Sequence, residues 1–98
     1  MKYLLTFAPE TPSPFTQLSA DALAAGKAKL AAAMKDGSVD VAYHKIGGGG
    51  FMVVNSSSHD ALAKILRGYN LTDVEVTPLL DTQDVLTGYQ QARAKLEA

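Results

Sequence analysis

The stretch that decides the fold is "SVDVAYHKIGGGGFMVVN", residues 38 to 55, in which four consecutive glycines separate two apolar runs. The run before the glycines alternates in polarity, and so does "FMVVN" after them. Alternation with a period of two predicts β-strands. A short glycine-rich connection between two such strands predicts an antiparallel hairpin.

A helix is predicted on each side of this hairpin. Ser19 can cap the first helix, "ADALAAGKAKLAAAMKDG", and Gly37 can end it; Ser57 or Ser58 can cap the second, "HDALAKILRGYN", which ends near Gly68. The apolar positions at helical spacing are Leu23, Leu30 and Met34 in the first helix, and Leu62, Ile65, Leu66 and Tyr69 in the second.

Two further strands and one more helix complete the pattern. "KYLLTF" (2–7) favours a strand, and so does "TDVEVTPLL" (72–80), where Pro78 indicates an edge strand or a strand end. Asp81 or Thr82 can cap a last helix, "QDVLTGYQQARAKLEA". Its apolar stripe consists of Val85, Tyr89, Ala92 and Leu96, and we expect Tyr89 to lie in the core.

The order β-α-β-β-α-β with a C-terminal helix predicts a single ferredoxin-like α+β domain over residues 1–98. Its four strands would form one antiparallel sheet with both main helices on one face. The uncovered face would expose Phe51, Val53 and Leu79 together, which predicts a homodimer, a dimeric α+β barrel that can associate further. The cleft between the two sheets would be the pocket for a small-molecule ligand.

Composition narrows the function classes. The chain is 47% hydrophobic and 19% charged with a net charge of −1, and its Lys and Arg residues are scattered, so we expect no nucleic-acid partner. It has no cysteine, which excludes disulfides and thiolate metal sites and makes a cytoplasmic location the expectation. No segment approaches the roughly 20 apolar residues that span a bilayer, so we expect no membrane partner.

The glycine run admits more than one interpretation. A phosphate cradle needs a glycine-rich loop that leads from a strand into a helix N-terminus. Here Gly47 to Gly50 lead into another strand, and no Gly-Lys-Ser or Gly-Lys-Thr follows. The run therefore favours a turn between two strands, and the remaining alternative is a mobile flap over the mouth of the cleft.

Strand parity selects the side chains that could line the cleft. Taking the more polar set as cleft-facing gathers Asp40, His44, Asn55, Glu75 and Thr77, with Thr6 as a further member. The strand before the glycines can also have the opposite orientation. Tyr43 and Lys45 would then face the cleft instead of Asp40 and His44. Phe15, in the proline-rich loop, is either a lid on the cleft or a packing anchor.

The stretch "SSSHDALAKILRGYNLTDVEVTPLL" (56–80) resembles the muconolactone Δ-isomerase family, whose last strand reads close to D-x-E-V-T-P-L. "YHKIGG" is similar to the end of the family's second strand, and "MKYLL" to the start of YCII-type proteins of the same superfamily. The resemblance implies a dimeric α+β barrel and cofactor-independent isomerisation of a small lactone or oxo/enol acid. The chain departs from the family at "DTQD" after the last strand and at the four glycines.

Such an isomerisation needs a base, an acid and a donor to the enolate oxygen. His44 and Glu75 have the right chemistry for proton transfer, and Tyr43 or Lys45 for the donor. No cofactor and no metal is expected, and the absence of tryptophan weighs against haem or quinol oxygenation. Structural alternatives remain: a solvent-facing His44, an interface ion pair for Glu75, and a non-catalytic dimeric barrel that binds a small apolar ligand.

Overall fold

The structure is a computed structural model that describes residues 1–10, 14–68 and 73–98. The predicted α+β class and the ferredoxin-like order of elements are confirmed, whereas Tyr69, predicted on an apolar stripe, lies outside the described residues. In chain order the elements are β1 (Lys2–Phe7), the short 3-10 helix η1 (Pro14–Gln17), α1 (Ala20–Asp36), β2 (Val39–His44), β3 (Gly50–Asn55), α2 (His59–Gly68), β4 (Val74–Leu79) and α3 (Thr82–Glu97).

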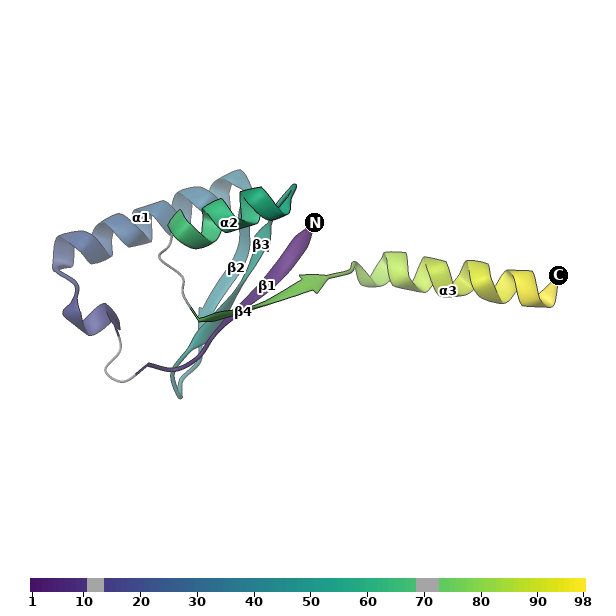
Figure 1. Ribbon diagram of the computed structural model, residues 1–98, viewed down its shortest axis with the longest axis horizontal. Helices are drawn as coiled ribbons and strands as arrows, with labels where there is room; N and C mark the ends of the chain where they lie inside the picture. Colours follow the sequence, from purple (N-terminus) through teal and green to yellow (C-terminus); the bar gives the residue numbers. More distant parts are fainter. Residues whose placement is uncertain (11–13, 69–72) are drawn as a thin grey trace.

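The four strands form one antiparallel sheet in the order β2-β3-β1-β4. Helices α1 and α2 both lie on one face of this sheet, as predicted (Figure 1). Strand β4 is at an edge of the sheet, the position at which a proline such as Pro78 is tolerated. The opposite face of the sheet is covered by neither α1 nor α2, and we call it the open face.

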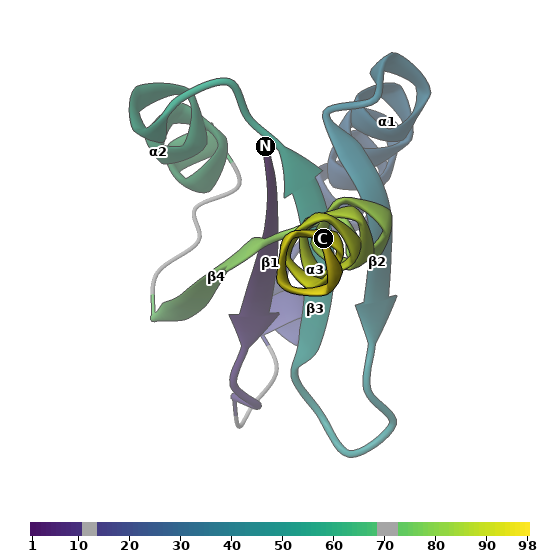
Figure 2. The ribbon, with the colours of Figure 1, turned by 90° about the vertical axis from the view of Figure 1, so that its right-hand side faces the viewer.

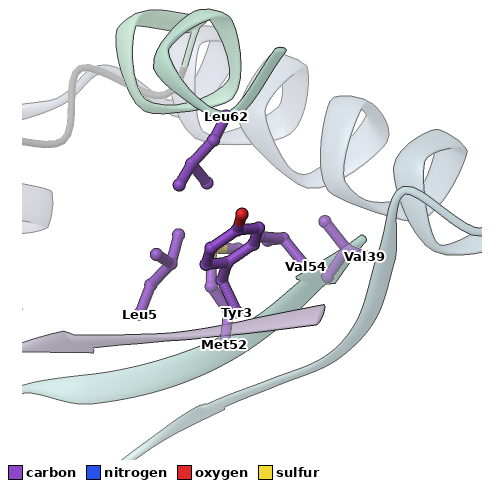
Figure 3. Packing of buried hydrophobic residues seen from close by; sticks show 6 residues of the cluster. All are labelled: Tyr3, Leu5, Val39, Met52, Val54 and Leu62. Atoms are coloured by element: carbon purple, nitrogen blue, oxygen red, sulfur yellow. The ribbon is translucent and has the colours of Figure 1, made fainter. Parts of the chain in front are cut away.

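The core lies between the sheet and the two helices (Figure 3). Its buried members are Tyr3, Leu5, Val39, Met52, Val54 and Leu62, of which Leu5, Val39 and Val54 are almost fully inaccessible. Alternate residues of β1 and β3 supply most of it, because successive strand side chains point to opposite faces. Partly buried Leu30 and Ile65, from the predicted stripes of α1 and α2, pack against this cluster.

Helix boundaries follow the predicted capping residues. The Ser19 hydroxyl accepts a hydrogen bond from the backbone N–H of Ala22 at 3.1 Å, and Gly37 ends α1 in the left-handed region at φ 86°. Of the two serines considered for α2, Ser58 accepts from a backbone N–H of the first turn. Of the two residues considered for α3, Asp81 is the N-cap and accepts from the backbone N–H of Gln83 at 2.8 Å.

Helix α3 departs from the expectation that Tyr89 lies in the core. It extends from the end of β4 on the side away from α1, so the molecule measures 64 Å along its longest axis (Figure 1). The radius of gyration is 17.5 Å, compared with about 13 Å for a compact domain of this length. Tyr89 is 72% exposed and Leu96 is 81% exposed. The core prediction for Tyr89 is wrong because none of the other described helices and strands packs against the stripe of α3 closely enough to bury it.

Candidate functional site

The open face is built from three rows of residues that run across the sheet. The register pairs Tyr43 with Phe51, Phe51 with Thr6, and Thr6 with Glu75, which makes one row from β2 to β4. A second row runs in the same way through Val41, Val53, Leu4 and Thr77. The third row contains Asn55, Lys2 and Leu79. In β1 and β3 these residues alternate with the buried ones, and the register extends the rows to β2 and β4, so all three rows lie opposite α1 and α2.

The first row carries two of the candidate site residues, Tyr43 and Glu75. At one end the ring of Tyr43 lies 5.6 Å from that of Phe51, and Tyr43 is 60% exposed. At the other end Glu75 stands on the edge strand β4 and is also exposed. Thr6 lies between them with its hydroxyl-bearing side chain half-buried. Three strand spacings of about 4.8 Å separate Tyr43 from Glu75, so about 14 Å divides their backbones.

The second row is a hydrophobic band. Leu4, Val41 and Val53 are half-buried and come from three different strands, while only Thr77 at the edge is polar. With Phe51 and Leu79 on the same face, the predicted apolar character of the uncovered sheet surface agrees with the register. Such a surface can receive the hydrocarbon part of a ligand or a second protein surface.

His44 lies on the other face of the sheet. Its register partner is Gly50, and it lies two residues after Ala42, whose side chain packs against the core on the same face. The His44 ring lies 5.4 Å from the ring of Phe15 in η1. The prediction that His44 shares a cleft-facing surface with Glu75 is therefore wrong within one chain, and Phe15 packs against His44 on the helix side instead of covering the open face.

The reason is a β-bulge in β2 that the alternating sequence does not reveal. Val39 pairs with Val54, but Val41 pairs with Val53, so Asp40 is an extra residue in β2. Val39 enters the core while Val41 and Tyr43 face the open side. Of the two orientations that the sequence allowed for β2, the register gives the one with Tyr43 on the open face.

Asp40 joins the polar end of the open face. Its carboxylate accepts hydrogen bonds from the Lys2 ammonium at 2.5 Å and from the Asn55 side-chain amide at 2.8 Å. The Lys2 hydrogen bond, and after it the Asn55 hydrogen bond, lower the pKa of Asp40 below its usual value. Asp40 and Asn55 thus lie on the predicted face, but Asp40 is already hydrogen-bonded to both Asn55 and Lys2. The prediction overlooked Lys2, although its parity in β1 opposite Tyr3 and Leu5 could have placed it.

The glycines form a turn between two strands. Gly50 is the first residue of β3, and Lys45 closes the turn through its backbone: its carbonyl accepts from Gly48 N–H at 3.0 Å, and its N–H donates to the Gly49 carbonyl at 2.9 Å. Gly48 and Gly49 have φ of 105° and 73°, which favour glycine. The turn interpretation is confirmed. Lys45, a candidate donor, is exposed at the hairpin rather than along the rows.

Two hollows flank the rows of the open face. One, of about 380 Å³, lies beside Met1, Asn55 and Ser56; the other, of about 540 Å³, lies at the base of α3 beside Lys2, Leu80 and Asp84. The described residues contain no group of three or more His, Asp or Glu side chains arranged to hold a metal ion. Nor does any helix in the described part of the chain have the length and apolar character needed to cross a membrane.

Comparison with known proteins gives no further assignment. No protein-family model matches the chain, and a search of curated proteins finds no significant sequence match. The resemblance of residues 56–80 to the muconolactone Δ-isomerases therefore stays a prediction, and the site rests on the geometry of the open face.

Proposed function

We propose that two copies of the chain pack with their open faces together and enclose a cleft for a small lactone or oxo/enol acid, in which Glu75 transfers a proton. The observation that carries this proposal is the row that joins Glu75, Thr6, Phe51 and Tyr43 on a face bordered by hydrophobic residues. The resemblance to muconolactone-isomerase-like proteins and a cytoplasmic location belong to the same proposal.

The proposed reaction moves one proton and needs no cofactor. The Glu75 carboxylate removes a proton from a carbon beside the carbonyl, which leaves an enolate, and the resulting carboxylic acid returns a proton at the other end of the conjugated system. A phenol O–H aimed at the enolate oxygen stabilises the charge that develops there. The hydrophobic second row binds the hydrocarbon part of the substrate and strengthens both interactions by excluding water.

A second subunit brings the two groups together. Within one chain Tyr43 is about 14 Å from Glu75, since they stand at opposite edges of the sheet. A two-fold axis parallel to the strands, between the two open faces, would set the partner's β2 opposite β4. The partner's Tyr43 would then face Glu75, so each of the two sites would draw its base and its donor from different subunits.

Non-catalytic binding of a small apolar ligand in the same cleft is the second candidate. It is favoured by the second row, in which Leu4, Val41 and Val53 form an uninterrupted hydrophobic band, and by the position of His44 on the opposite face. In this case Glu75 would serve as an interface ion-pair member rather than as a base.

Deuterium incorporation distinguishes the candidates. The protein is incubated in D₂O with a panel of unsaturated five-membered lactones and 2-oxo acids, and NMR follows both binding and exchange of the carbon-bound proton. The isomerase predicts catalysed exchange that Glu75→Gln lowers by roughly 10²–10⁴-fold with the dimer intact. The control Glu10→Gln makes the same chemical change at an exposed carboxylate outside the strands.

Each remaining outcome has a defined meaning. Binding without exchange supports the apolar binding protein. A weaker dimer in Glu75→Gln, with unchanged exchange per dimer, assigns Glu75 to an interface ion pair. Neither binding nor exchange with any member of the panel contradicts both candidate functions.

A further inference from the structure

Helix α3 carries a hydrophobic stripe that its own chain leaves exposed. Val85, Tyr89, Ala92 and Leu96 recur at spacings of four, three and four, which places them along one side of the helix. Only Val85 is half-buried, while Tyr89 and Leu96 are 72% and 81% exposed. None of the described residues of α3 is buried. A helix of this length gains most of its stability from packing. We therefore expect the stripe to pack against a second protein surface.

The direction of α3 indicates where that contact lies. Two residues, Leu80 and the capping Asp81, separate α3 from the end of β4. Figure 1 shows it leading away from the sheet on the side opposite α1, and in Figure 2, viewed from that side, it is seen end-on in front of β3, between β1 and β2. The helix therefore projects on the side of the open face, where a partner subunit would sit.

We infer that α3 is an exchanged arm: in a dimer of this chain, the stripe of each α3 packs along the flank of the partner subunit. This inference rests on the dimer of the proposed function. Both subunits would give an arm and receive one, because a two-fold axis makes every contact reciprocal.

The open face gives the proposed dimer a contact surface to which the arms can add. Four strands spaced about 4.8 Å apart, each of six residues rising about 3.3 Å, present roughly 400 Å² of flat area. Stable protein interfaces commonly bury about 800 Å² on each partner. The accessible surface of such a face exceeds its flat area, and the exposed stripes of the two arms would add further hydrophobic surface to the sheet-to-sheet contact.

The length of the arm fits the same arrangement. Sixteen helical residues span about 24 Å. Packed sheets lie about 10 Å apart, so an arm of this length that projects on the side of the open face is long enough to reach the partner subunit and pack along its flank. At the base of the arm, the hollow of about 540 Å³ beside Leu79 and the 78% exposed Leu80 can receive side chains of the partner.

Charge placed on the stripe tests the inference in the full-length chain. Tyr89→Glu with Leu96→Glu puts two carboxylates on the stripe, and Thr87→Glu with Gln91→Glu puts two on the opposite side of the same helix as the matched control. Sedimentation over a concentration series should show at least a 100-fold weaker dimer for the stripe variant than for the control, as expected for loss of two large hydrophobic contacts. Circular dichroism checks that both variants keep their helices.

The results separate failure of the arm from failure of the dimer. A native chain that is monomeric at low micromolar concentration overturns the dimer and the arm with it. A stripe variant that dimerises as tightly as the control overturns the arm and leaves the dimer standing.

A cross-linking experiment reports the location of the arm directly. The chain has no cysteine, so Leu96→Cys gives one attachment point for a photoreactive cross-linker. Mixed ¹⁴N- and ¹⁵N-labelled chains are refolded together, and the cross-linked peptides are analysed by mass. Peptide pairs that combine both isotopes show exchange between subunits. Pairs of a single isotope throughout show an arm that folds back on its own chain and would overturn the inference.

Discussion

The rings of Phe15 and His44 lie 5.4 Å apart on the helix side of the sheet, whereas Glu75 stands on the open face at the far edge. His44 belongs to the edge strand β2 and Glu75 to the edge strand β4. The two residues that the sequence predicted as a proton-transfer pair therefore lie on opposite faces and at opposite edges of the sheet. The relationship assigns His44 a packing role and leaves Glu75 to the open face.

His44→Ala should therefore leave the proposed proton-shift activity within about 2-fold of the native chain, because a residue without contact to the cleft contributes little to the barrier. It should lower the free energy of unfolding by less than about 1 kcal/mol, since the ring pair is largely exposed. Urea denaturation of His44→Ala, Phe15→Ala and the double variant measures the pair. A fall in activity of 10-fold or more with normal stability would return His44 to the site.

The fold was predictable because its signals are local. Alternation defined the strands, Ser19 and Gly37 bounded α1, and the glycine run marked the hairpin. The face of β2 was not predictable in the same way. One extra residue, Asp40, reverses the parity of everything after it, and its hydrogen bonds to Lys2 and Asn55 come from strands distant in sequence. The stripe of α3 was visible, but a helical period does not say whether the surface it faces belongs to the same chain.

Asp40→Asn should make stability less dependent on pH in acid. The pKa of Asp40 is lowered in the folded protein, chiefly by Lys2, so the folded state binds fewer protons than the unfolded state. Its contribution is present above the unfolded value of about 3.9 and is lost as pH falls through the lower folded value. Thermal unfolding between about pH 5 and pH 2 should show a steeper loss for the native chain than for the variant.

Lys2→Gln is the partner variant for this experiment. It removes the main cause of the lowered pKa, so it should flatten the acid dependence in the same way, and adding Asp40→Asn should change little more. Asp36, whose pKa is lowered by Ser38, keeps its own acid dependence in every variant. Identical pH profiles for the native chain and both single variants would contradict the assignment.

Two glycines of the turn should respond oppositely to alanine. At Gly49 the backbone has φ 73°, and an added Cβ would collide with the carbonyl oxygen of Phe7. Gly49→Ala should cost at least about 1–2 kcal/mol of unfolding free energy. Gly47 has open space around its Cα and no positive φ, so Gly47→Ala should be neutral or stabilise by up to about 1 kcal/mol. Chemical denaturation of both measures the difference, and equal losses would contradict the turn geometry.

Leu4 and Leu5 are adjacent in β1 but face opposite sides of the sheet, so their truncation should affect different equilibria. Leu5 is fully buried among the core residues under α2, and Leu5→Ala should cost about 2–5 kcal/mol at every protein concentration, because it leaves a cavity in each subunit.

Leu4 lies in the hydrophobic second row of the open face. Leu4→Ala should mainly weaken the proposed dimer. Because dimer formation makes the melting temperature depend on concentration, its effect should appear as an altered concentration dependence rather than as a uniform loss. Melting curves over a 100-fold range of protein concentration separate the two effects. If Leu4→Ala lowers the melting temperature equally at all concentrations, the open face is not the interface between subunits.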